Sequence, residues 1–267
     1  MRFDDESYYK AYDHNYRVAY EEGFGYCGEG GNQAPALNRL AGLLEKTGLA
    51  GHGTKVLDIG CGDGTEGIFL ASLGYCYTGI DVSPAAIERA RQRTAADGVS
   101  ADFRVGDAMN LSGFAMGEFP LVLDSYCLQC LVLDRHRQAY FRSVKRVMKD
   151  EGVLLLRGTT DHTAFEGPVN SFEQFCERSG TCTAGVALQK CVHGTWHEVS
   201  GKRQYLFGRA QTMAAYQKEF SDNGFRIVHQ EVYKSKGAAH AEGVFILKKA
   251  EQTQEKRSAN KPMQATL

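Results

Sequence analysis

A cluster of glycines and aspartates between two short apolar runs is the part of this sequence best suited to chemistry. The segment Asp58–Gly64 reads DIGCGDG, and Asp81 closes the next apolar run. Gly60 and Gly62 would let the backbone pass close beneath a ligand, because glycine carries no side chain. A carboxylate at the end of the second run can accept hydrogen bonds from both hydroxyls of a ribose. The pattern therefore predicts a loop that binds a nucleoside, with adenosine as the implied moiety.

The spacing of the glycines and the nearby charges narrow this ligand further. A dinucleotide fingerprint requires G-x-G-x-x-G, whereas Thr65 occupies the sixth position here and the third glycine comes one residue early, at Gly64. Carboxylates at Asp58 and Asp63 would repel a pyrophosphate but suit a ligand that carries an ammonium and a sulfonium. We therefore expect S-adenosylmethionine as the cofactor and S-adenosylhomocysteine as its product.

Elements of alternating type must position this loop. Periodicity and turn residues predict strands and helices in the order β-α-β-α, and this order continues beyond the loop. The expected strands cover residues 55–60, 75–83, 101–107, 119–127, 152–158, 225–233 and 243–249; the helices cover 36–49, 63–74, 83–98, 134–148 and 212–223. Such alternation predicts an α/β fold, a doubly wound, mostly parallel sheet with helices on both faces.

From Asp58 to Gly64 the chain resembles the class I S-adenosylmethionine-dependent methyltransferases, whose first motif is acidic-x-Gly-x-Gly-x-Gly. The likeness extends to the acidic Asp81 and to the GDA segment after the third strand, where the family's aspartate usually meets the adenine amine. It covers residues 53–158 strongly and the final helix and hairpin by order of elements. It implies a Rossmann-like sheet of seven strands with the last one antiparallel. The implied cofactor contacts are Asp58, Gly60, Cys61, Gly62, Asp81, Val82, Asp107, Ala108 and Tyr126.

The other segments divide around this expected domain. Residues 51–160 and 210–250 would form the cofactor-binding domain, and residues 161–209 an inserted substrate lid. Residues 1–50 would form an aromatic helical cap. Within it, residues 12–37 resemble an aromatic N-terminal element that some members fold over the cofactor, with matching residues at Tyr12, Tyr16, Gly23 and Tyr26. The polar tail, residues 251–267, is predicted to be disordered.

The chemistry expected of such a site is modest. Methyl transfer from a sulfonium is an in-line displacement with an excellent leaving group, so the protein mainly aligns the reactants and excludes water. The fourth strand ends in DSYC and lacks the Asn/Asp-Pro-Pro-Tyr motif used on exocyclic base nitrogens. The formal net charge of −1 also gives no reason to expect a nucleic acid partner.

The residues of the expected lid favour an anionic substrate. Basic and aromatic side chains near its end could grip an anionic group and stack on an apolar one. We expect O-methylation of a carboxylate, or of a hydroxyl, on a small metabolite or modified peptide natural product. A carboxylate is already ionised at neutral pH and needs no general base, whereas a hydroxyl or amine would use His162 or His197. The substrate candidates are Tyr20, Gln129, Trp196, Arg203 and Tyr205.

Three alternatives stay open from the sequence. An S- or N-methyltransferase of small molecules would share every cofactor residue. Aminopropyl transfer from decarboxylated S-adenosylmethionine would use a related cofactor. A protein that binds the cofactor without chemistry would need no substrate groups.

The cysteines, the metals and the location complete these expectations. The 8 cysteines are expected to be reduced, with Cys127 and Cys130 as buried thiols. Cys176, Cys182, Cys191 and His193 could form a zinc site, but no catalytic metal is expected. The sequence contains neither a signal peptide pattern nor an apolar run that could span a bilayer, so we expect a cytoplasmic protein without a membrane partner. The oligomeric state is not predicted.

Overall fold

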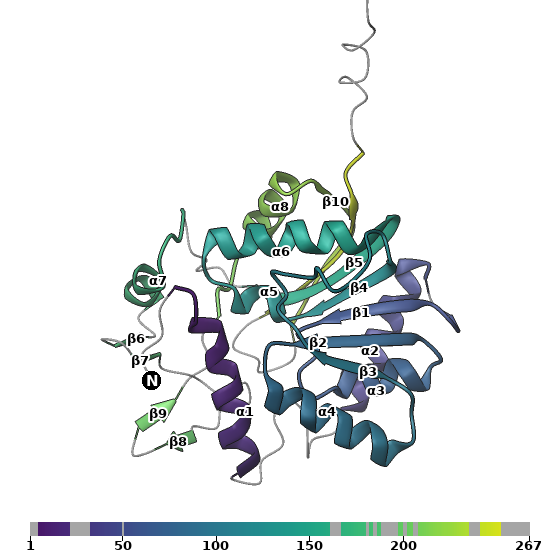
Figure 1. Cartoon of the computed structure of the whole chain (residues 1–267). Coiled ribbons are helices and arrows are strands. Elements are labelled where there is room, and N and C mark those ends of the chain that lie inside the picture. Colours follow the sequence, from purple (N-terminus) through teal and green to yellow (C-terminus); the bar gives the residue numbers. More distant parts are fainter. Residues whose placement is uncertain are drawn as a thin grey trace, which may run out of the picture.

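A seven-stranded sheet forms the centre of the molecule, with the strand order β10-β11-β5-β4-β1-β2-β3 (Figure 1). Its strands are β1 (Lys55–Ile59), β2 (Cys76–Asp81), β3 (Asp102–Val105), β4 (Phe119–Ser125), β5 (Met148–Thr160), β10 (Phe225–Tyr233) and β11 (Ala241–Lys249). The computed structural model describes residues 5–21, 33–49, 51–160, 167–179, 182–183, 186–187, 197–199, 202–204, 208–234 and 241–251.

The pairing of the strands confirms the fold predicted from the sequence. Strand β1 pairs in parallel with both β2 and β4, and β4 pairs in parallel with β5. Strand β11, the last along the chain, is antiparallel to β5 and to β10. The hairpin β10–β11 therefore completes the sheet, with β10 on its edge and β11 one position inside.

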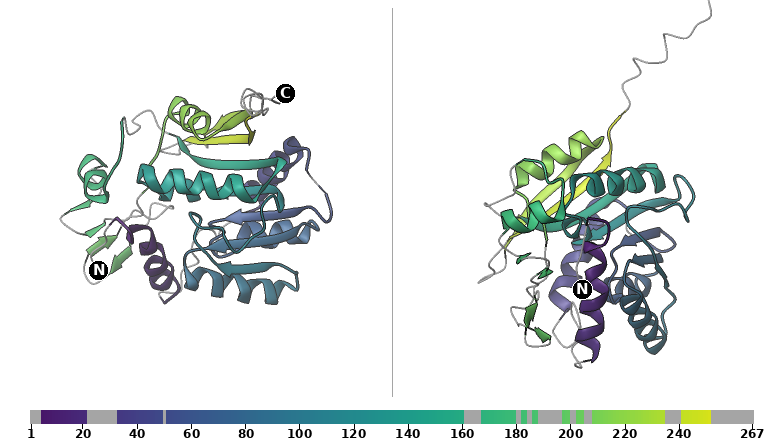
Figure 2. Two further views of the ribbon diagram at one scale, coloured as in Figure 1. Left: turned by 45° about the horizontal axis from the view of Figure 1, so that its top comes forward. Right: turned by 60° about the vertical axis from the view of Figure 1, so that its left-hand side comes forward.

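Helices cover both faces of the sheet (Figures 1 and 2). One face packs against α6 (Asp134–Val147) and α8 (Met213–Asp222), and the other against α2 (Ala34–Thr47), α3 (Thr65–Ser72) and α4 (Pro84–Asp97). Strands buried on both faces send successive side chains to opposite layers. Thus Val122 packs with the first layer, whereas Leu121 and Leu123 pack with the second.

Local signals set the ends of α4, which follows β2 directly. The Ser83 hydroxyl accepts a hydrogen bond from the Ala86 amide at 3.1 Å, as an N-cap should, and Pro84 takes the first helical position. The helix ends at Gly98, which has a left-handed φ of 65°. Both ends agree with the prediction.

The short helix η1 (Tyr8–Lys10) and α1 (Ala11–Glu21) lie apart from the two helical layers, beside the edge at which the parallel strands end (Figures 1 and 2). Tyr8 and Ala11 pack there in a small apolar cluster with Phe172 and Phe175 of α7 (Phe172–Ser179). Further along, Ala19 packs against Ala86 of α4. The N-terminal helix thus bridges α7 and α4.

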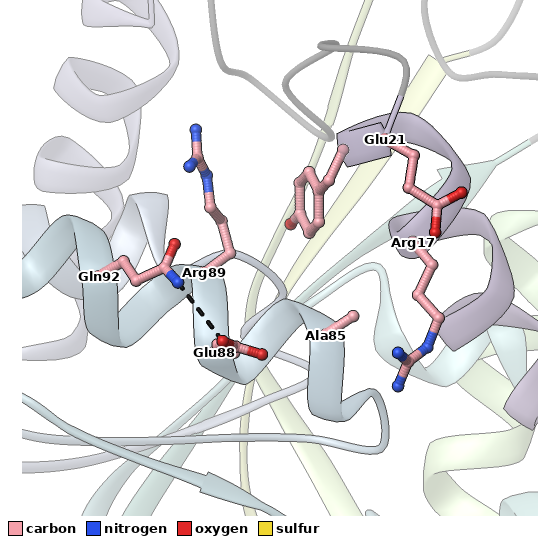
Figure 3. A pocket seen from close by; sticks show the side chains of 7 residues that line it. Arg17, Glu21, Ala85, Glu88, Arg89 and Gln92 are labelled. Atoms are coloured by element: carbon pink, nitrogen blue, oxygen red, sulfur yellow. Dashed lines mark hydrogen bonds between the residues drawn. The ribbon is translucent and has the colours of Figure 1, made fainter.

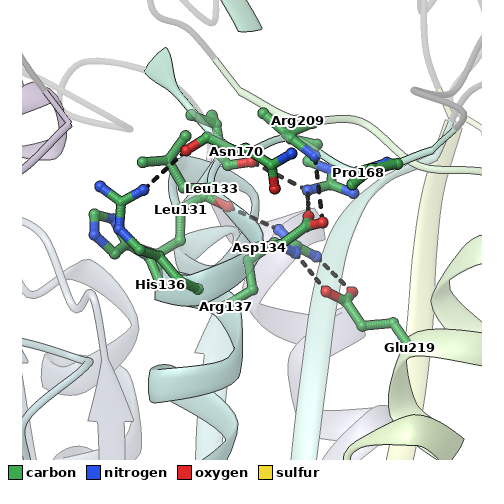
Figure 4. Close-up of polar contacts among 12 residues, drawn as sticks. Leu131, Leu133, Asp134, His136, Arg137, Pro168, Asn170, Arg209 and Glu219 are labelled. Atoms are coloured by element: carbon green, nitrogen blue, oxygen red, sulfur yellow. Dashed lines mark hydrogen bonds and ion pairs between the residues drawn. The ribbon is translucent and has the colours of Figure 1, made fainter. Parts of the chain in front are cut away.

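Buried ion pairs fix the start of α6 near the same edge (Figure 4). Arg137, only 1% exposed, donates to both carboxylate oxygens of Glu219 on α8, at 2.5 and 2.7 Å. The same guanidinium donates to the carbonyl oxygens of Leu128 and Leu131. The connection from β4 to α6 is therefore held to α8 by one side chain.

The segment 161–209, predicted as a lid, contains several short elements. Besides α7, these are β6 (Cys182–Thr183) paired with β7 (Val186–Ala187), and β8 (His197–Val199) paired with β9 (Lys202–Gln204). Its C-terminal end is attached by Arg209, which forms an ion pair with Asp134 (Figure 4). The role of a lid stays a prediction. None of the helices in the described ranges is both long enough and apolar enough to cross a membrane.

Candidate functional site

The turn after β1 requires glycine for steric reasons. Gly60 and Gly62 have φ angles of 76° and 54°, a left-handed region that side chains disfavour. A Cβ atom on Gly60 would lie 2.6 Å from the Cβ of Cys127, which begins α5 (Cys127–Cys130). The amides of Gly60 and Cys61 both donate to the Ile80 carbonyl, at 2.8 and 2.9 Å. The turn is therefore held tightly between β2 and α5.

Asp81, the residue expected to bind ribose, lies beside this turn with its carboxylate fixed by main-chain amides. Gly62 N donates to Oδ2 at 3.0 Å, and Ser83 N donates to Oδ1 at 2.8 Å. Burial raises the pKa of Asp81 to about 6, even though these two bonds act in the opposite direction. Each carboxylate oxygen accepts two hydrogen bonds readily, so the group retains capacity for two hydroxyl donors.

Asp58 contributes a buried acceptor that the fold leaves unused. Its Oδ2 accepts a hydrogen bond from the Tyr77 hydroxyl at 2.6 Å, whereas Oδ1 is buried with no partner. Burial raises the pKa of Asp58 well above its usual range, and the charge of Glu66 adds to this effect. An orphaned carboxylate oxygen of this kind suits a cationic ligand. Asp63 forms an ion pair with Arg93 of α4 through its Oδ1, at 2.9 Å.

Asp107, at the predicted adenine position, lies at the end of β3. Its Oδ1 accepts from the Met109 amide at 2.8 Å, and its Oδ2 accepts from the Tyr9 hydroxyl at 3.3 Å. Burial and the Asp107 carboxylate together raise the pKa of Tyr9 to about 12, so the phenol remains a donor. Val82 and Ala108, which follow Asp81 and Asp107 in the chain, are both partly buried.

The turn after β4 carries backbone strain. Tyr126 has a φ of 71°, and within the described ranges it is the one non-glycine residue with a positive φ. Such strain costs free energy and tends to occur at functional sites. Asp124 stabilises the turn because its buried carboxylate accepts from the amides of Cys127 and Leu128 and from the Tyr140 hydroxyl. The strained turn therefore faces the turn after β1 through the contact of Cys127 with Gly60.

The N-terminal helices η1 and α1 contact all three predicted cofactor motifs. Tyr9 contacts Asp107, Asp13 contacts the residues that follow Asp81, and Tyr16 lies beside the turn after β1. The Asp13 carboxylate accepts from the Ser83 hydroxyl at 2.8 Å and from the Ala85 amide at 3.1 Å. The Tyr16 hydroxyl lies 2.7 Å from the position that a Cβ on Gly62 would occupy. Sequence reasoning missed Asp13 and Tyr9 as parts of the site. Tyr9, Asp13 and Tyr16 are four and three positions apart, which is the spacing of residues on one face of a helix, and this pattern could have identified them.

Of the predicted catalytic and substrate residues, only Gln129 and Tyr20 have side chains in the described part of the structure. The Gln129 side chain accepts from the Thr159 amide at 2.9 Å and thereby joins α5 to β5. His197 and Arg203 lie in the paired strands β8 and β9, and only their backbone is described. His162, Trp196 and Tyr205 lie outside the described residues, so all of these roles stay predictions.

Tyr20 lines a pocket between α1 and α4 (Figure 3). This pocket has a volume of about 250 Å³. The Arg89 guanidinium lies 5.7 Å from the centre of the Tyr20 ring, and Arg17 and Glu21 border the pocket from α1. The structure thus groups Tyr20 with α4, whereas Gln129 lies beyond the end of β4.

The thiols and the metal candidates can be located in part. Cys61, Cys127 and Cys130 are free thiols, and burial raises the pKa of each. The side chains of Cys176, Cys182, Cys191 and His193 lie outside the described part of the chain, so the zinc hypothesis stays open. Among the residues that are described, no three potential ligands gather in a way that could hold a metal ion.

Comparison with known proteins agrees with this geometry. Residues 56–152 match the family model described as a methyltransferase domain. The chain is 31% identical over 106 residues to an uncharacterized methyltransferase of Schizosaccharomyces pombe, which covers 40% of this chain and 72% of that protein. It is 33% identical over 128 residues to a ubiquinone biosynthesis O-methyltransferase of Xanthomonas euvesicatoria, covering 47% of this chain and 52% of the relative. The chain thus spans about half the length of that relative.

A solved structure shares the fold over nearly the whole chain. It is the 1,6-didemethyltoxoflavin-N1-methyltransferase of Burkholderia thailandensis, with bound 1,6-didemethyltoxoflavin and S-adenosylhomocysteine. The TM-score is 0.62 at 15% sequence identity, covering 92% of this chain and 91% of the other. At this level of identity the comparison concerns the fold alone.

Proposed function

Because the chain belongs to the class I S-adenosylmethionine-dependent methyltransferases, we propose that it methylates an oxygen atom of a small organic acceptor. The acceptor that we favour is a carboxylate on a small metabolite or modified peptide, with a hydroxyl as the second choice. The observation that carries the choice of oxygen is the 33% identity over 128 residues to a ubiquinone biosynthesis O-methyltransferase.

The residues at the strand ends fit the family's cofactor, S-adenosylmethionine. Asp81 would hold the ribose hydroxyls, and the buried Oδ1 of Asp58 would face the positively charged end of the ligand. Gly60 and Gly62, which have left-handed φ angles, form the turn between these two carboxylates and add no side chains of their own to it. When bound, the cofactor supplies a methyl group activated by its sulfonium. The chain supplies alignment and a dry environment.

A carboxylate acceptor fits the modest demands of this chemistry. A carboxylic acid with an ordinary pKa near 4 is almost fully ionised at neutral pH, so the acceptor attacks without first losing a proton. The basic residues of the segment 190–209, among them Arg203, support an anionic acceptor at the level of sequence. A hydroxyl acceptor would need a base, and His162 or His197 would have to provide it.

Product chemistry tests the proposal. The purified protein would be incubated with methyl-deuterated S-adenosylmethionine and a panel of carboxylic acids, phenols, thiols, amines and peptides, with Asp81→Asn as the cofactor-binding control. A labelled product that mild alkali hydrolyses is the methyl ester that we expect. A product stable to alkali identifies a hydroxyl acceptor when the label is on oxygen, and it refutes O-methylation when the label is on sulfur or nitrogen. Tight cofactor binding without turnover on cell extracts would indicate a non-catalytic binding protein.

A further inference from the structure

Asn15 of α1 is a polar side chain that the fold buries without pairing it. The residue is 8% exposed, and both the amide nitrogen Nδ2 and the oxygen Oδ1 are buried with no hydrogen-bond partner. Buried amides in native proteins almost always have partners, because desolvation without compensation costs free energy. An amide with its donor and its acceptor both unused is therefore a candidate ligand group.

The helical repeat places Asn15 on a definite side of α1. Successive residues are rotated by about 100°, so Asn15 lies about 40° from Ala11 and about 200° from Asp13. Asp13 contacts the start of α4, whereas Ala11 packs in the cluster with α7. Asn15 thus faces away from the start of α4, and it lies about one turn beyond Ala11, on the side of the helix that packs in the cluster with α7.

The neighbouring tyrosines bring this part of α1 to the strand ends. The Tyr16 hydroxyl reaches the turn after β1 at Gly62, and Tyr12 forms a side-chain hydrogen bond with Cys130 of α5. Asn15 lies between them in sequence, on the same half of the helix. An asparagine side chain is much shorter than a tyrosine, so its amide stops short of the edge that the hydroxyls reach. Around the helix axis Asn15 lies between Ala11 and Tyr12, about 40° and 60° away, so its amide is on the side of α1 from which Tyr12 contacts α5.

The chemistry of the unused atoms identifies the matching group. A carboxylate alone would satisfy Nδ2 and leave Oδ1 buried next to an anion, whereas an amino-acid zwitterion satisfies both atoms. Its ammonium donates to Oδ1, and its carboxylate accepts from Nδ2. Another buried acceptor without a hydrogen-bond partner, Oδ1 of Asp58, also favours a cation. We propose that Asn15 binds the amino-acid end of S-adenosylmethionine and thereby holds α1 against the bound cofactor.

This inference concerns cofactor binding and does not depend on which atom of the substrate is methylated. It predicts a contact with one half of the ligand only. S-Adenosylhomocysteine carries the amino-acid end, whereas 5′-methylthioadenosine has the same nucleoside without it. A residue that contacts this end distinguishes the two ligands, and a residue that merely supports the fold does not.

Titration calorimetry of Asn15→Leu with both ligands tests the proposal, with His14→Leu, at an exposed neighbouring position of α1, as the matched control. We expect Asn15→Leu to weaken S-adenosylhomocysteine binding by about tenfold or more, which corresponds to the loss of hydrogen bonds to charged groups. Binding of 5′-methylthioadenosine should stay within about twofold, and His14→Leu should change neither affinity by more than about this.

A second measurement separates ligand contact from structural support. Leucine has nearly the shape of asparagine and removes an unpaired buried amide, so free Asn15→Leu should melt at or above the temperature of the wild type. Equal losses for both ligands, or no loss for S-adenosylhomocysteine, would overturn the proposal. Unchanged cofactor binding with a raised KM for the acceptor would assign Asn15 to the substrate instead.

Discussion

Replacing Gly60 by alanine tests whether the turn after β1 is constrained by its contact with Cys127, in the turn after β4. Gly60 has a φ of 76°, and an added Cβ would lie 2.6 Å from the Cβ and 2.8 Å from the Sγ of Cys127. The neighbouring atoms belong to the first residue of α5, whose amide is held by Asp124 at 2.8 Å. Neither side of the contact can therefore move without disturbing a turn.

The expected cost has two parts, which a matched glycine separates. A left-handed conformation costs a non-glycine residue about 1–2 kcal/mol, and overpacking in a tight site adds about 1–3 kcal/mol. Gly48 has a similar φ of 71° but has no atom within 4 Å of its would-be Cβ. Gly48→Ala should therefore cost only the first part, whereas Gly60→Ala should cost about 2–5 kcal/mol in total.

Urea denaturation of Gly48→Ala, Gly60→Ala, Cys127→Gly and the double variant Gly60→Ala/Cys127→Gly measures these costs, and calorimetry with S-adenosylhomocysteine measures the effect on the site. Cys127→Gly removes the atoms that the new Cβ would meet. In that background Gly60→Ala should cost about the same as Gly48→Ala. Cofactor affinity should fall in Gly60→Ala and recover in the double variant. If Gly60→Ala costs no more than Gly48→Ala, or if Cys127→Gly gives no rescue, the contact does not shape the turn.

Two further predictions follow from the buried charges. Because Asp81 titrates near pH 6 in the free protein and ribose hydroxyls donate to its ionised form, affinity for S-adenosylhomocysteine should fall as the pH is lowered through 6. At one pH unit below the pKa about a tenth of the carboxylate is ionised, so calorimetry at pH 5 should show a loss of about tenfold relative to pH 7.5. Asp81→Asn should bind weakly with a flat profile over this range, and a slope that persists in this variant would point to another group. Arg137→Met should destabilise the fold by about 3 kcal/mol because it leaves the partly buried carboxylate of Glu219 without its cationic partner. In urea denaturation, Arg137→Met/Glu219→Met should regain most of this loss, and no recovery would mean that the pair is not the cause.

The part of the fold that the sequence predicts is the part set by neighbours along the chain. Ser83 caps α4 through an amide three residues later, and Gly98 ends the same helix with its left-handed φ. The turn from Asp58 to Gly64 follows from its own residue types. Such features depend on local chemistry, so a single sequence is enough to recognise them.

Contacts between distant segments are the part that the sequence does not reveal. Arg137 and Glu219 are 82 positions apart, and nothing near either residue marks the other as its partner. The contact between Asp13 and Ser83 spans 70 positions. The left-handed conformation of Tyr126 is also unexpected, because tyrosine has no preference for it. Its cause lies in the tertiary structure, where Asp124 and Arg157 hold the two sides of the turn.

The site divides into two halves that differ in how they are held. On the sheet, main-chain amides position the carboxylate of Asp81, and its own carbonyl accepts from the Gly106 amide at 2.9 Å, so each strand end supports the next. On the N-terminal side, within residues 5–21, η1 and α1 contact the motifs through side chains. A backbone network changes little unless the sheet opens, whereas side-chain contacts exchange at the cost of a few rotamers. The sheet half should therefore keep its geometry in the free protein, and the affinity that the cofactor gains from α1 should depend on Tyr9, Asp13 and Asn15.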